Sequence, residues 1–431
     1  MKVLLKAAII ITSFYFTHAM NNNTVPELGR NIRSQFLFEP DYISLNHGSY
    51  GSIPKMLVPV LHDLRMKSEV NPDRWLRREM FTEIDKNRNT LANLVHADPQ
   101  ELVFVFNAMT GINTVARSLP LEAGDKILYF NTAYNSVEST IKFVKNYDKL
   151  KLVKIDLAYP MSDSEVLDLI EETIENENQK NDGAIKVCFM DAISSVPAVL
   201  FPFESAIKLV RKHNILSMVD GAHAIGQIPL DLHEMDPDFF ITNCHKWLYA
   251  PRGCAVLYVP SRNQRLIHPA IINSDYQDHS DPSDETNTFQ KEFAWPGTAD
   301  FSNFMCINPA MEFRRSLGGE EAIMKYAHDL AVKGGEIAAK ILETDVMENA
   351  EKTLTVAMVN VRLPLKKPNV SDVEVVQVFI DKLLYEHNCM APVYKHNDIW
   401  YTRLSAQVYN DVTDFEYVAK AILSVCKELE S

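Results

Sequence analysis

The sequence predicts an α/β fold: a mostly parallel central sheet wrapped by helices, followed by a smaller C-terminal α+β domain. Two observations support this prediction. From about residue 100, short apolar segments alternate with helix-like segments, and this alternation stops after about residue 310. The chain has 431 residues, 46% of them apolar, which is enough to form one large core and a smaller one.

The first part of the chain supplies the elements of the large sheet. Its strand-like segments are short apolar runs at 101–106, 125–130, 152–157, 185–193, 215–222, 239–242 and 254–259. Helix-like segments separate most of them, at 110–119, 136–147, 164–179 and 203–214. Because strands that alternate with helices are joined by crossover connections, we expect a largely parallel sheet covered by helices.

The second part of the chain has a different order of elements. Helix-like segments lie at 318–343 and 371–387, strand-like segments lie at 353–363, 390–394 and 399–407, and a helix ends the chain. This order is typical of an α+β domain. We therefore predict an N-terminal arm, a large domain and a small C-terminal domain, at residues 20–60, 61–305 and 306–431.

The first 19 residues differ from the rest of the chain. Two lysines precede an apolar run from Ala7 to Phe16, which is too short for a comfortable membrane span. We interpret residues 1–19 as a secretory signal peptide cleaved after Ala19, which would place the protein in the secretory pathway or outside the cell. If the segment is instead an uncleaved or non-functional tail, we expect a cytoplasmic protein. Glycosylation sequons at Asn22 and Asn369 are compatible with secretion.

Acidic residues outnumber basic residues in this chain. It has 57 Asp and Glu against 43 Lys and Arg, which gives a net charge of −14. This balance argues against binding to nucleic acids or anionic membranes, because their phosphate groups would be repelled. The six cysteines fit neither a metal-site spacing nor a disulfide framework, so we expect buried thiols and no bound metal.

Three predicted strand ends carry chemically suggestive residues, and ligands of open α/β sheets bind at such ends. Thr110 follows the first strand at the start of a helix, where free N–H groups could hold a phosphate, although Thr110 could also be a simple helix cap. Asp220 and Lys246 follow two other apolar strands, where a charge needs a partner. The two could form a structural ion pair. Alternatively, Lys246 could bind an aldehyde as an imine while Asp220 keeps a ring nitrogen protonated.

Several motifs resemble a known family. They are LNHGSYGSIP at 45–54, NPDRWLRRE at 71–79, HKWLYAPRG at 245–253 and RLSAQVYN at 403–410, together with DGAH at 220–223 and WPGT at 295–298. From about Leu45 onward the chain resembles the class V aminotransferase superfamily, and within it the isopenicillin N epimerase-like branch. That branch includes the carbon–sulfur lyases that cleave hercynylcysteine sulfoxide in ergothioneine synthesis. The resemblance implies pyridoxal 5′-phosphate as cofactor and the transferase fold type I.

The resemblance implies roles for residues around the cofactor ring. Lys246 resembles the Schiff-base lysine, whose freed amine acts as a general base beside the substrate α-carbon. Asp220 would hold the pyridine nitrogen protonated. His223 matches the position near the phenolic oxygen, with a hydrogen-bonded core histidine as the alternative. Tyr134 matches the ring-stacking position and could protonate a leaving group, or it could merely fill a pocket.

The resemblance also implies a phosphate site and a homodimer with shared active sites. The implied phosphate contacts are His245, Asn243, Thr110 and the backbone of Ala108 and Met109. Asn243 stands where the family usually has a small hydroxyl residue. In the family, the segment that matches Gly297-Thr298 comes from the partner subunit and caps the phosphate. Many relatives carry an arginine where this chain has Ala299.

For the substrate, an amino acid, the resemblance implies an anchor in the small domain. Arg403 matches the arginine that binds the α-carboxylate, and its fork of donors suits a bidentate contact, with a structural salt bridge as the alternative. Asn46 and His47 are expected to approach the substrate from the N-terminal arm. A basic cluster could recognise a second acidic group or form a solvated helix face, and it consists of Arg74, Arg77 and Arg78.

We therefore predict a pyridoxal-phosphate-dependent lyase. It would eliminate the sulfur group from a cysteine-derived sulfoxide and give pyruvate and ammonia. An amino-acid epimerase and an aminotransferase would share the removal of the α-proton. A cysteine desulfurase would need a nucleophilic cysteine before Arg403, and Cys389 lies fourteen residues before it, although we expect a buried thiol there. A secreted binding or structural protein on the same fold is the non-enzymatic alternative.

Overall fold

The structure of the protein is a computed structural model that describes residues 25–278, 289–366 and 368–430. The predicted signal peptide at residues 1–19 and the sequon at Asn22 lie outside the described residues. Among the residues that are described, no helix is long and apolar enough to cross a membrane.

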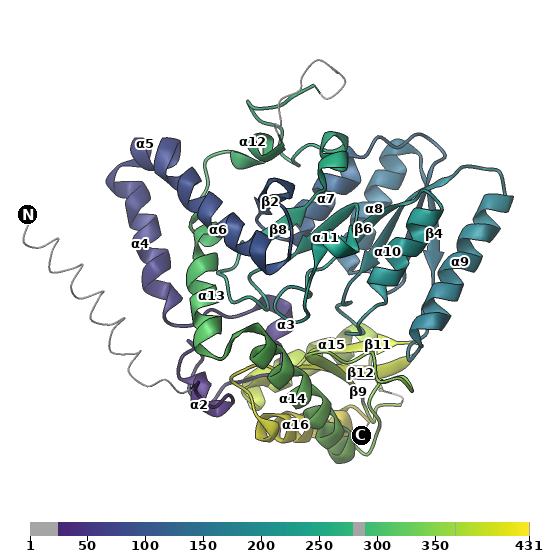
Figure 1. The fold of residues 1–431 in the computed structure, drawn as a ribbon. Coiled ribbons are helices and arrows are strands. Elements are labelled where there is room, and N and C mark those ends of the chain that lie inside the picture. The colour runs from purple at the N-terminus through teal and green to yellow at the C-terminus, as the bar shows by residue number, and fades with distance from the viewer. Residues whose placement is uncertain (1–24, 279–288, 367, 431) are drawn as a thin grey trace, which may run out of the picture.

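A seven-stranded sheet forms the centre of the large domain (Figure 1). Its strands lie in the order β2-β8-β7-β6-β5-β3-β4, and all neighbouring pairs are parallel except the two that involve β8. This arrangement confirms the mostly parallel sheet predicted from the alternating segments. The strands are β2 (Leu102–Val105), β3 (Lys126–Phe130), β4 (Lys151–Ile155), β5 (Ile185–Asp191), β6 (Leu216–Asp220), β7 (Phe239–Thr242) and β8 (Ala255–Tyr258).

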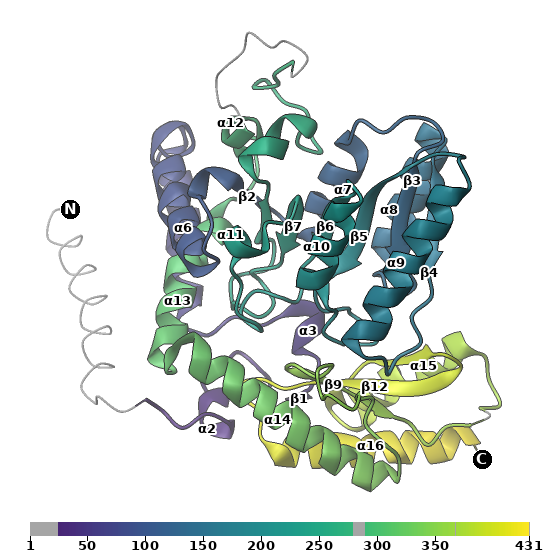
Figure 2. The same cartoon turned by 45° about the vertical axis from the view of Figure 1, so that its right-hand side comes forward.

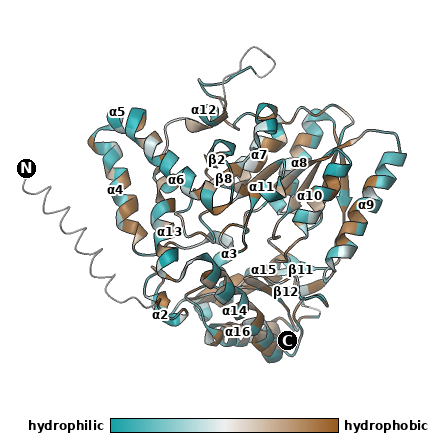
Figure 3. Ribbon diagram, in the orientation of Figure 1, coloured by the Kyte–Doolittle hydropathy of each residue, from teal (hydrophilic) through white to brown (hydrophobic). Residues whose placement is uncertain are grey.

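Helices cover both faces of this sheet because its strands are apolar on both sides. In β3, Ile127 and Tyr129 belong to the apolar cluster that contains the helices α7 (Ala108–Ser118) and α8 (Asn135–Asp148). The alternate residues, Leu128 and Phe130, belong to the cluster on the other face, which contains α9 (Asp163–Gln179) and α10 (Phe203–Lys212). In Figure 3, α9 alternates between hydrophobic and hydrophilic residues, as expected for a helix with one buried face. Other helices of the large domain are α4 (Leu57–Val70), α5 (Pro72–Arg74), α6 (Met80–Leu94), α11 (Leu232–Met235) and α12 (Phe289–Ala294). The next helix, α13 (Ile307–Ser316), lies in the range predicted for the small domain but contributes Ile307, Ala310 and Met311 to the large-domain core.

The smaller C-terminal domain is built around an antiparallel sheet in the order β11-β12-β9 (Figure 2). Its strands are β9 (Met358–Arg362), β11 (Val393–His396) and β12 (Ile399–Ser405). Apolar residues of this sheet and of the helices α14 (Gly319–Leu342), α15 (Asp372–Asp381) and α16 (Val412–Glu430) form a core that is separate from those of the large domain. The predicted α+β domain is thereby confirmed.

The N-terminal arm connects the two domains. It contains α2 (Arg30–Arg33) and β1 (Ile43–Ser44), and β1 pairs in parallel with β10 (Cys389–Met390) of the small domain. The short helix α3 (His47–Tyr50) follows and lies at the junction between the two domains in both views (Figures 1 and 2). The arm therefore brings residues from the beginning of the chain to the carboxyl ends of the large sheet.

Candidate active site

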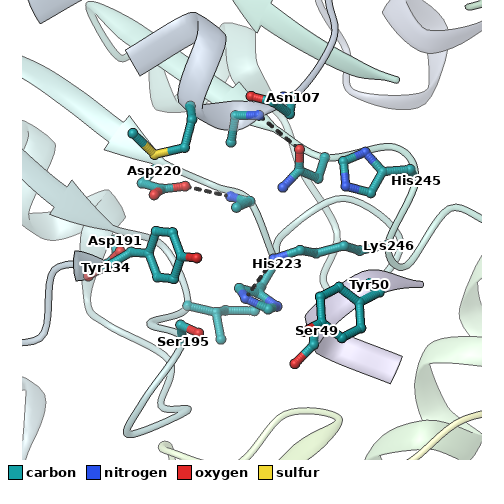
Figure 4. Close-up of a pocket in the computed structure, with 15 residues that line it drawn as sticks. Ser49, Tyr50, Asn107, Tyr134, Asp191, Ser195, Asp220, His223, His245 and Lys246 are labelled. Atoms are coloured by element: carbon teal, nitrogen blue, oxygen red, sulfur yellow. Dashed lines mark hydrogen bonds between the residues drawn. The ribbon is translucent and has the colours of Figure 1, made fainter. Parts of the chain in front are cut away.

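A cavity of about 260 Å³ lies at the carboxyl ends of the central strands and is shown in Figure 4. Asp191, Asp220 and Tyr134 lie on one side of it, and His245, Lys246 and Tyr50 lie on the other. We call it the active-site cavity, and its lining residues are Ser49, Tyr50, Asn107, Ala108, Met109, Tyr134, Asp191, Ile193, Ser195, Asp220, Ala222, His223, Asn243, His245 and Lys246.

Most of the predicted site residues meet in this cavity. They come from the ends of two strands, β6 and β7, and the starts of two helices, α7 and α8, and they are Lys246, Asp220, His223, His245, Asn243, Ala108, Met109 and Tyr134. Six other predicted residues do not line it, namely Thr110, Gly297, Thr298, Arg403, Asn46 and His47. Four of these contact residues that do line it, namely Thr110, Arg403, Asn46 and His47.

Lys246 follows β7 and extends its amine into the cavity. The Nζ atom of Lys246 lies 3.1 Å from Nε2 of His223. No hydrogen bond or ion pair joins Lys246 to Asp220, although both line the cavity. Desolvation lowers the pKa of Lys246 to about 8, and the positive charge of Arg403 acts in the same direction. An amine with this pKa is available as a nucleophile or a base near neutral pH.

Two carboxyl groups lie side by side at the ends of neighbouring strands. Asp191 ends β5 and Asp220 ends β6, and the two are paired in the register of the parallel strands. Asp220 accepts a hydrogen bond from the backbone N–H of Ala222 at 2.9 Å. Desolvation raises the pKa of both carboxyl groups, and the charge of Asp220 raises that of Asp191 further. Asp191 was not among the predicted site residues, although it also ends an apolar strand and the reasoning applied to Asp220 holds for it too.

The N-terminus of α7 forms the third side of the cavity. Its N-cap, Asn107, accepts the backbone N–H of Thr110 at 2.9 Å and its hydroxyl at 3.2 Å. The side-chain oxygen of Asn243 accepts the backbone N–H of Ala108 at 2.9 Å. The first turn of a helix presents N–H groups and a positive dipole end, which together favour an anion.

His245 also lines this end of the cavity. Its Nδ1 lies 3.0 Å from the carbonyl oxygen of Cys254, so Nδ1 carries the proton and Nε2 is left for another partner. Desolvation lowers the pKa of His245 to about 4. A phosphate beside this ring would favour its charged form and oppose that shift.

Arg403 lies directly behind the cavity. Its guanidinium donates to the backbone carbonyl of Ser195 at 3.0 Å, to Asn46 at 2.9 Å and to the hydroxyl of Ser49 at 2.7 Å. Its Nε has no hydrogen-bond partner in the described structure, and burial lowers the pKa of the group to about 10. Ser49 and Ser195, which our sequence analysis missed, therefore lie between Arg403 and the cavity. Ser49 lies one turn after Asn46, within the LNHGSYGSIP motif at 45–54.

His47 supports the loop that carries Lys246. Its Nε2 lies 2.9 Å from the carbonyl oxygen of Lys246, and its Nδ1 lies 2.9 Å from the hydroxyl of Tyr409. Burial lowers the pKa of His47 to about 4. Because His47 does not line the active-site cavity, it holds the backbone of the loop instead of facing the space inside.

The cysteines and the predicted phosphate-capping segment lie elsewhere. All six cysteines are buried, none lines the cavity, and burial raises the pKa of Cys389 to about 12. Thr298 and Ala299 line a separate cavity of about 440 Å³ beside Trp75. Arg74, Arg77 and Arg78 are exposed, and two of them pair with nearby acids, which is the pattern of a solvated helix face.

Pyridoxal 5′-phosphate fits the groups that surround the active-site cavity. Its aldehyde requires an amine, which Lys246 provides, and its ring nitrogen requires an acid, which Asp220 provides. Its phosphate suits the first turn of α7 together with His245. Tyr134 is 48% exposed at the mouth of the cavity, with its hydroxyl directed inward in Figure 4.

Comparison with known proteins agrees with this arrangement. The chain is 35% identical to the hercynylcysteine sulfoxide lyase of Schizosaccharomyces pombe, over 92% of this chain and 98% of that protein. It is 30% identical to an L-cysteine desulfhydrase-like protein of Epichloe uncinata, over 95% of this chain and 98% of that protein. The apo structure of a cysteine desulfurase from Thermococcus onnurineus NA1 has a TM-score of 0.75 at 19% identity, covering 95% of this chain and 100% of that one, which confirms the predicted fold type.

The comparison at the level of families covers most of the chain. The sequence model described as aminotransferase class-V matches residues 54–418. This range includes the central sheet, Asp220, Lys246 and the strand that carries Arg403. The chain therefore belongs to the class V aminotransferase family.

Proposed function

We propose that the protein is a pyridoxal-phosphate-dependent C–S lyase that cleaves a cysteine-derived sulfoxide to pyruvate and ammonia. The observation that supports this most strongly is that the amine of Lys246, the carboxyl group of Asp220 and the phenol of Tyr134 line one cavity. A base, an acid that serves the cofactor and a proton donor are the three groups that β-elimination requires. The similarity to a hercynylcysteine sulfoxide lyase suggests a large S-substituent on the substrate.

When bound, pyridoxal 5′-phosphate supplies an aldehyde for a covalent bond to an amine and a ring that accepts electrons from the substrate α-carbon. Lys246 provides the amine, and Asp220 keeps the ring nitrogen protonated. His245 and the first turn of α7 would hold the phosphate. Ser49 and Ser195, held by Arg403, would position the substrate carboxylate.

The reaction then needs two proton transfers by side chains of this chain. Lys246 removes the proton from the α-carbon, and the electron pair left behind forms the double bond between the α- and β-carbons as the C–S bond breaks. The electron pair of the C–S bond leaves with the sulfur, and the sulfoxide oxygen takes a proton from the Tyr134 hydroxyl, so the leaving group departs as a sulfenic acid. The three-carbon remainder is released as 2-aminoacrylate, which water converts to pyruvate and ammonia.

The structure does not favour the cysteine desulfurase alternative. A desulfurase needs a thiol that reaches the substrate sulfur, and none of the six cysteines lines the cavity. Burial also raises the pKa of Cys389, so its thiol would not be a ready nucleophile at neutral pH. Epimerisation and transamination begin with the same α-proton removal, and products must distinguish them.

The test is to load the purified protein with pyridoxal 5′-phosphate and mix it with hercynylcysteine sulfoxide, with a small S-alkyl cysteine sulfoxide and with cysteine. Pyruvate, the sulfur product and α-proton exchange in D₂O are followed together. Pyruvate and a sulfenic acid product formed in equal amounts support the lyase. Exchange without pyruvate would select an epimerase, and release of sulfide from free cysteine alone would select a desulfhydrase.

Tyr134→Phe separates the two proton transfers. Loss of a general acid should reduce pyruvate formation by about 10²- to 10⁴-fold. Exchange of the α-proton should continue, because Lys246 performs it. Equal loss of both signals would show that Tyr134 acts in binding and not as the proton donor to the leaving group.

We also propose that the active unit is a homodimer in which Gly297 and Thr298 of one chain cap the phosphate in the other. Thr298 is exposed and lies outside the active-site cavity of its own chain, as this proposal requires.

Secretion through cleavage after Ala19 is a further proposal, with a cytoplasmic protein as its alternative. Sequencing the N-terminus of the mature protein tests it.

A further inference from the structure

We propose that Trp247 is a positioning residue that sets the protonation of Lys246 through His223. The indole nitrogen of Trp247 lies 3.3 Å from Nδ1 of His223, and Nε2 of His223 lies 3.1 Å from Nζ of Lys246. Three side chains thus form one hydrogen-bonded chain that ends at the reactive amine. The proposal rests on the proposed function for the role of that amine, but the chain of contacts itself does not.

The direction of each hydrogen bond follows from the chemistry of the indole group. An indole N–H can only donate, so Nδ1 of His223 must accept and carries no proton. A neutral imidazole has a single N–H, which must then be on Nε2. The N–H on Nε2 can donate a hydrogen bond to Lys246 only if the amine has a free lone pair. Only the unprotonated amine has one. Trp247 therefore selects the tautomer of His223 that stabilises the free amine.

The surroundings keep His223 neutral. It is 3% exposed, and the charged and titratable groups that face it are Lys246, Arg403, His245 and His47. Desolvation by burial is the largest cause that lowers the pKa of His223, and none of these four groups is an acid that could oppose it. A neutral ring with one N–H is thus the form that the site selects, and only its tautomer remains to be decided.

Buried contacts also hold the backbone at Trp247 in place. Its carbonyl oxygen accepts a hydrogen bond from Arg314 at 2.7 Å. Arg314 is fully buried and is itself held by two bonds of 2.6 Å to Glu320. A Cβ atom on Gly226, whose φ is +79°, would lie 2.7 Å from the same carbonyl oxygen. The indole is 2% exposed, so its N–H has no alternative solvent partner.

The test uses the apo-protein and no substrate, so it is independent of whether the protein is a lyase. The rate at which Lys246 reacts with pyridoxal 5′-phosphate is measured against pH, and the midpoint reports the pKa of its amine. Trp247→Phe removes the N–H and keeps an aromatic ring. We expect its midpoint to rise by about half to one pH unit, the effect of losing one neutral hydrogen bond. Trp400→Phe, at a buried tryptophan of the small domain, is the matched control and should leave the midpoint unchanged.

His223→Leu distinguishes positioning from packing. A leucine side chain neither donates nor accepts a hydrogen bond, so it cannot relay the effect of the Trp247 N–H to Lys246, and Trp247→Phe should cause no further shift in the His223→Leu protein. An equal shift in both backgrounds would mean that Trp247 acts only through packing, and no shift in the wild-type background would overturn the proposal directly.

The wild-type protein gives a third readout that does not require the tryptophan variant to fold. The ¹⁵N spectrum of its histidine rings should show His223 protonated at Nε2, with His223→Leu identifying the signal. A proton on Nδ1 of His223 would contradict the proposal. If the protein had no lyase activity, the pH midpoints and the ¹⁵N spectrum would be unaffected. A failure of the proposed function and a failure of this proposal therefore give different results.

Discussion

The reactivity of Lys246 depends on which charges lie near its amine. Desolvation lowers its pKa most, the cation of Arg403 lowers it further, and Asp220 partly opposes both. Arg403→Gln should therefore raise the midpoint for reaction of the apo-protein with pyridoxal 5′-phosphate above pH 8. Stopped-flow absorbance against pH measures it. Arg362→Gln, on the neighbouring strand β9, is the control. A midpoint unchanged by Arg403→Gln would show that Arg403 does not act on Lys246 through its charge.

Asp191 should destabilise the apo-protein at neutral pH. Folding raises the pKa of its carboxyl group, through desolvation and the charge of Asp220. The folded state therefore binds more protons than the unfolded state, and stability falls as the pH rises above the ordinary carboxyl pKa of about 4. Asp191→Asn should raise the Tm of the apo-protein at pH 7, and this gain should vanish at about pH 3, where the carboxyl group of Asp191 is neutral in both the folded and the unfolded state. A gain of equal size at both pH values would assign the effect to packing.

The helix α3 is held against the lysine loop at very short range. Gly51 ends α3 with a φ of +65°, and a Cβ atom there would lie 1.9 Å from the carbonyl oxygen of His245. Gly51→Ala must therefore move α3 away from the loop and weaken the contact between His47 and Lys246. We expect a loss of stability beyond the roughly 1–2 kcal/mol of left-handed backbone strain, together with slower reaction of Lys246 with the cofactor.

Gly124→Ala is the matched control for this element. Gly124 also has a positive φ, +95°, but no atom lies within 4 Å of its Cβ position. It should cost only about 1–2 kcal/mol in urea denaturation and leave the reaction of Lys246 unchanged. Equal losses in the two variants would show that α3 can move without strain.

At the scale of the whole molecule, the proposed homodimer makes a prediction about mixed subunits. If each site needs its own Lys246 and the partner's Thr298, then Lys246→Ala and Thr298→Val proteins should each have low activity alone. Mixed dimers would contain one complete site, so mixing after mild denaturation should restore up to about one quarter of the wild-type activity. Native mass spectrometry, with a tag of different mass on each subunit, checks that mixed dimers have formed. No recovery in confirmed mixed dimers would place Thr298 in its own chain's site.

The main elements of the fold were predictable because their signals are local. Each strand of the large sheet is a short apolar run, and each intervening helix has one buried face. Asp220 and Lys246 were identified as candidates for the same reason, because each follows an apolar strand where a charge is unusual. The family resemblance added roles to His223, Tyr134 and Arg403.

The sequence by itself therefore determined the class of fold, the family and the strand ends that carry the reactive groups. Only the tertiary structure decided which side chains touch. The register of β5 and β6 places Asp191 beside Asp220, and the contact between the arm and the small domain places Ser49 on Arg403. The bond from Trp247 to His223 depends in the same way on how a buried loop is packed. The physical reason is that periodicity reports which residues are buried, whereas hydrogen bonds between distant residues depend on strand register and domain docking, which no local pattern encodes.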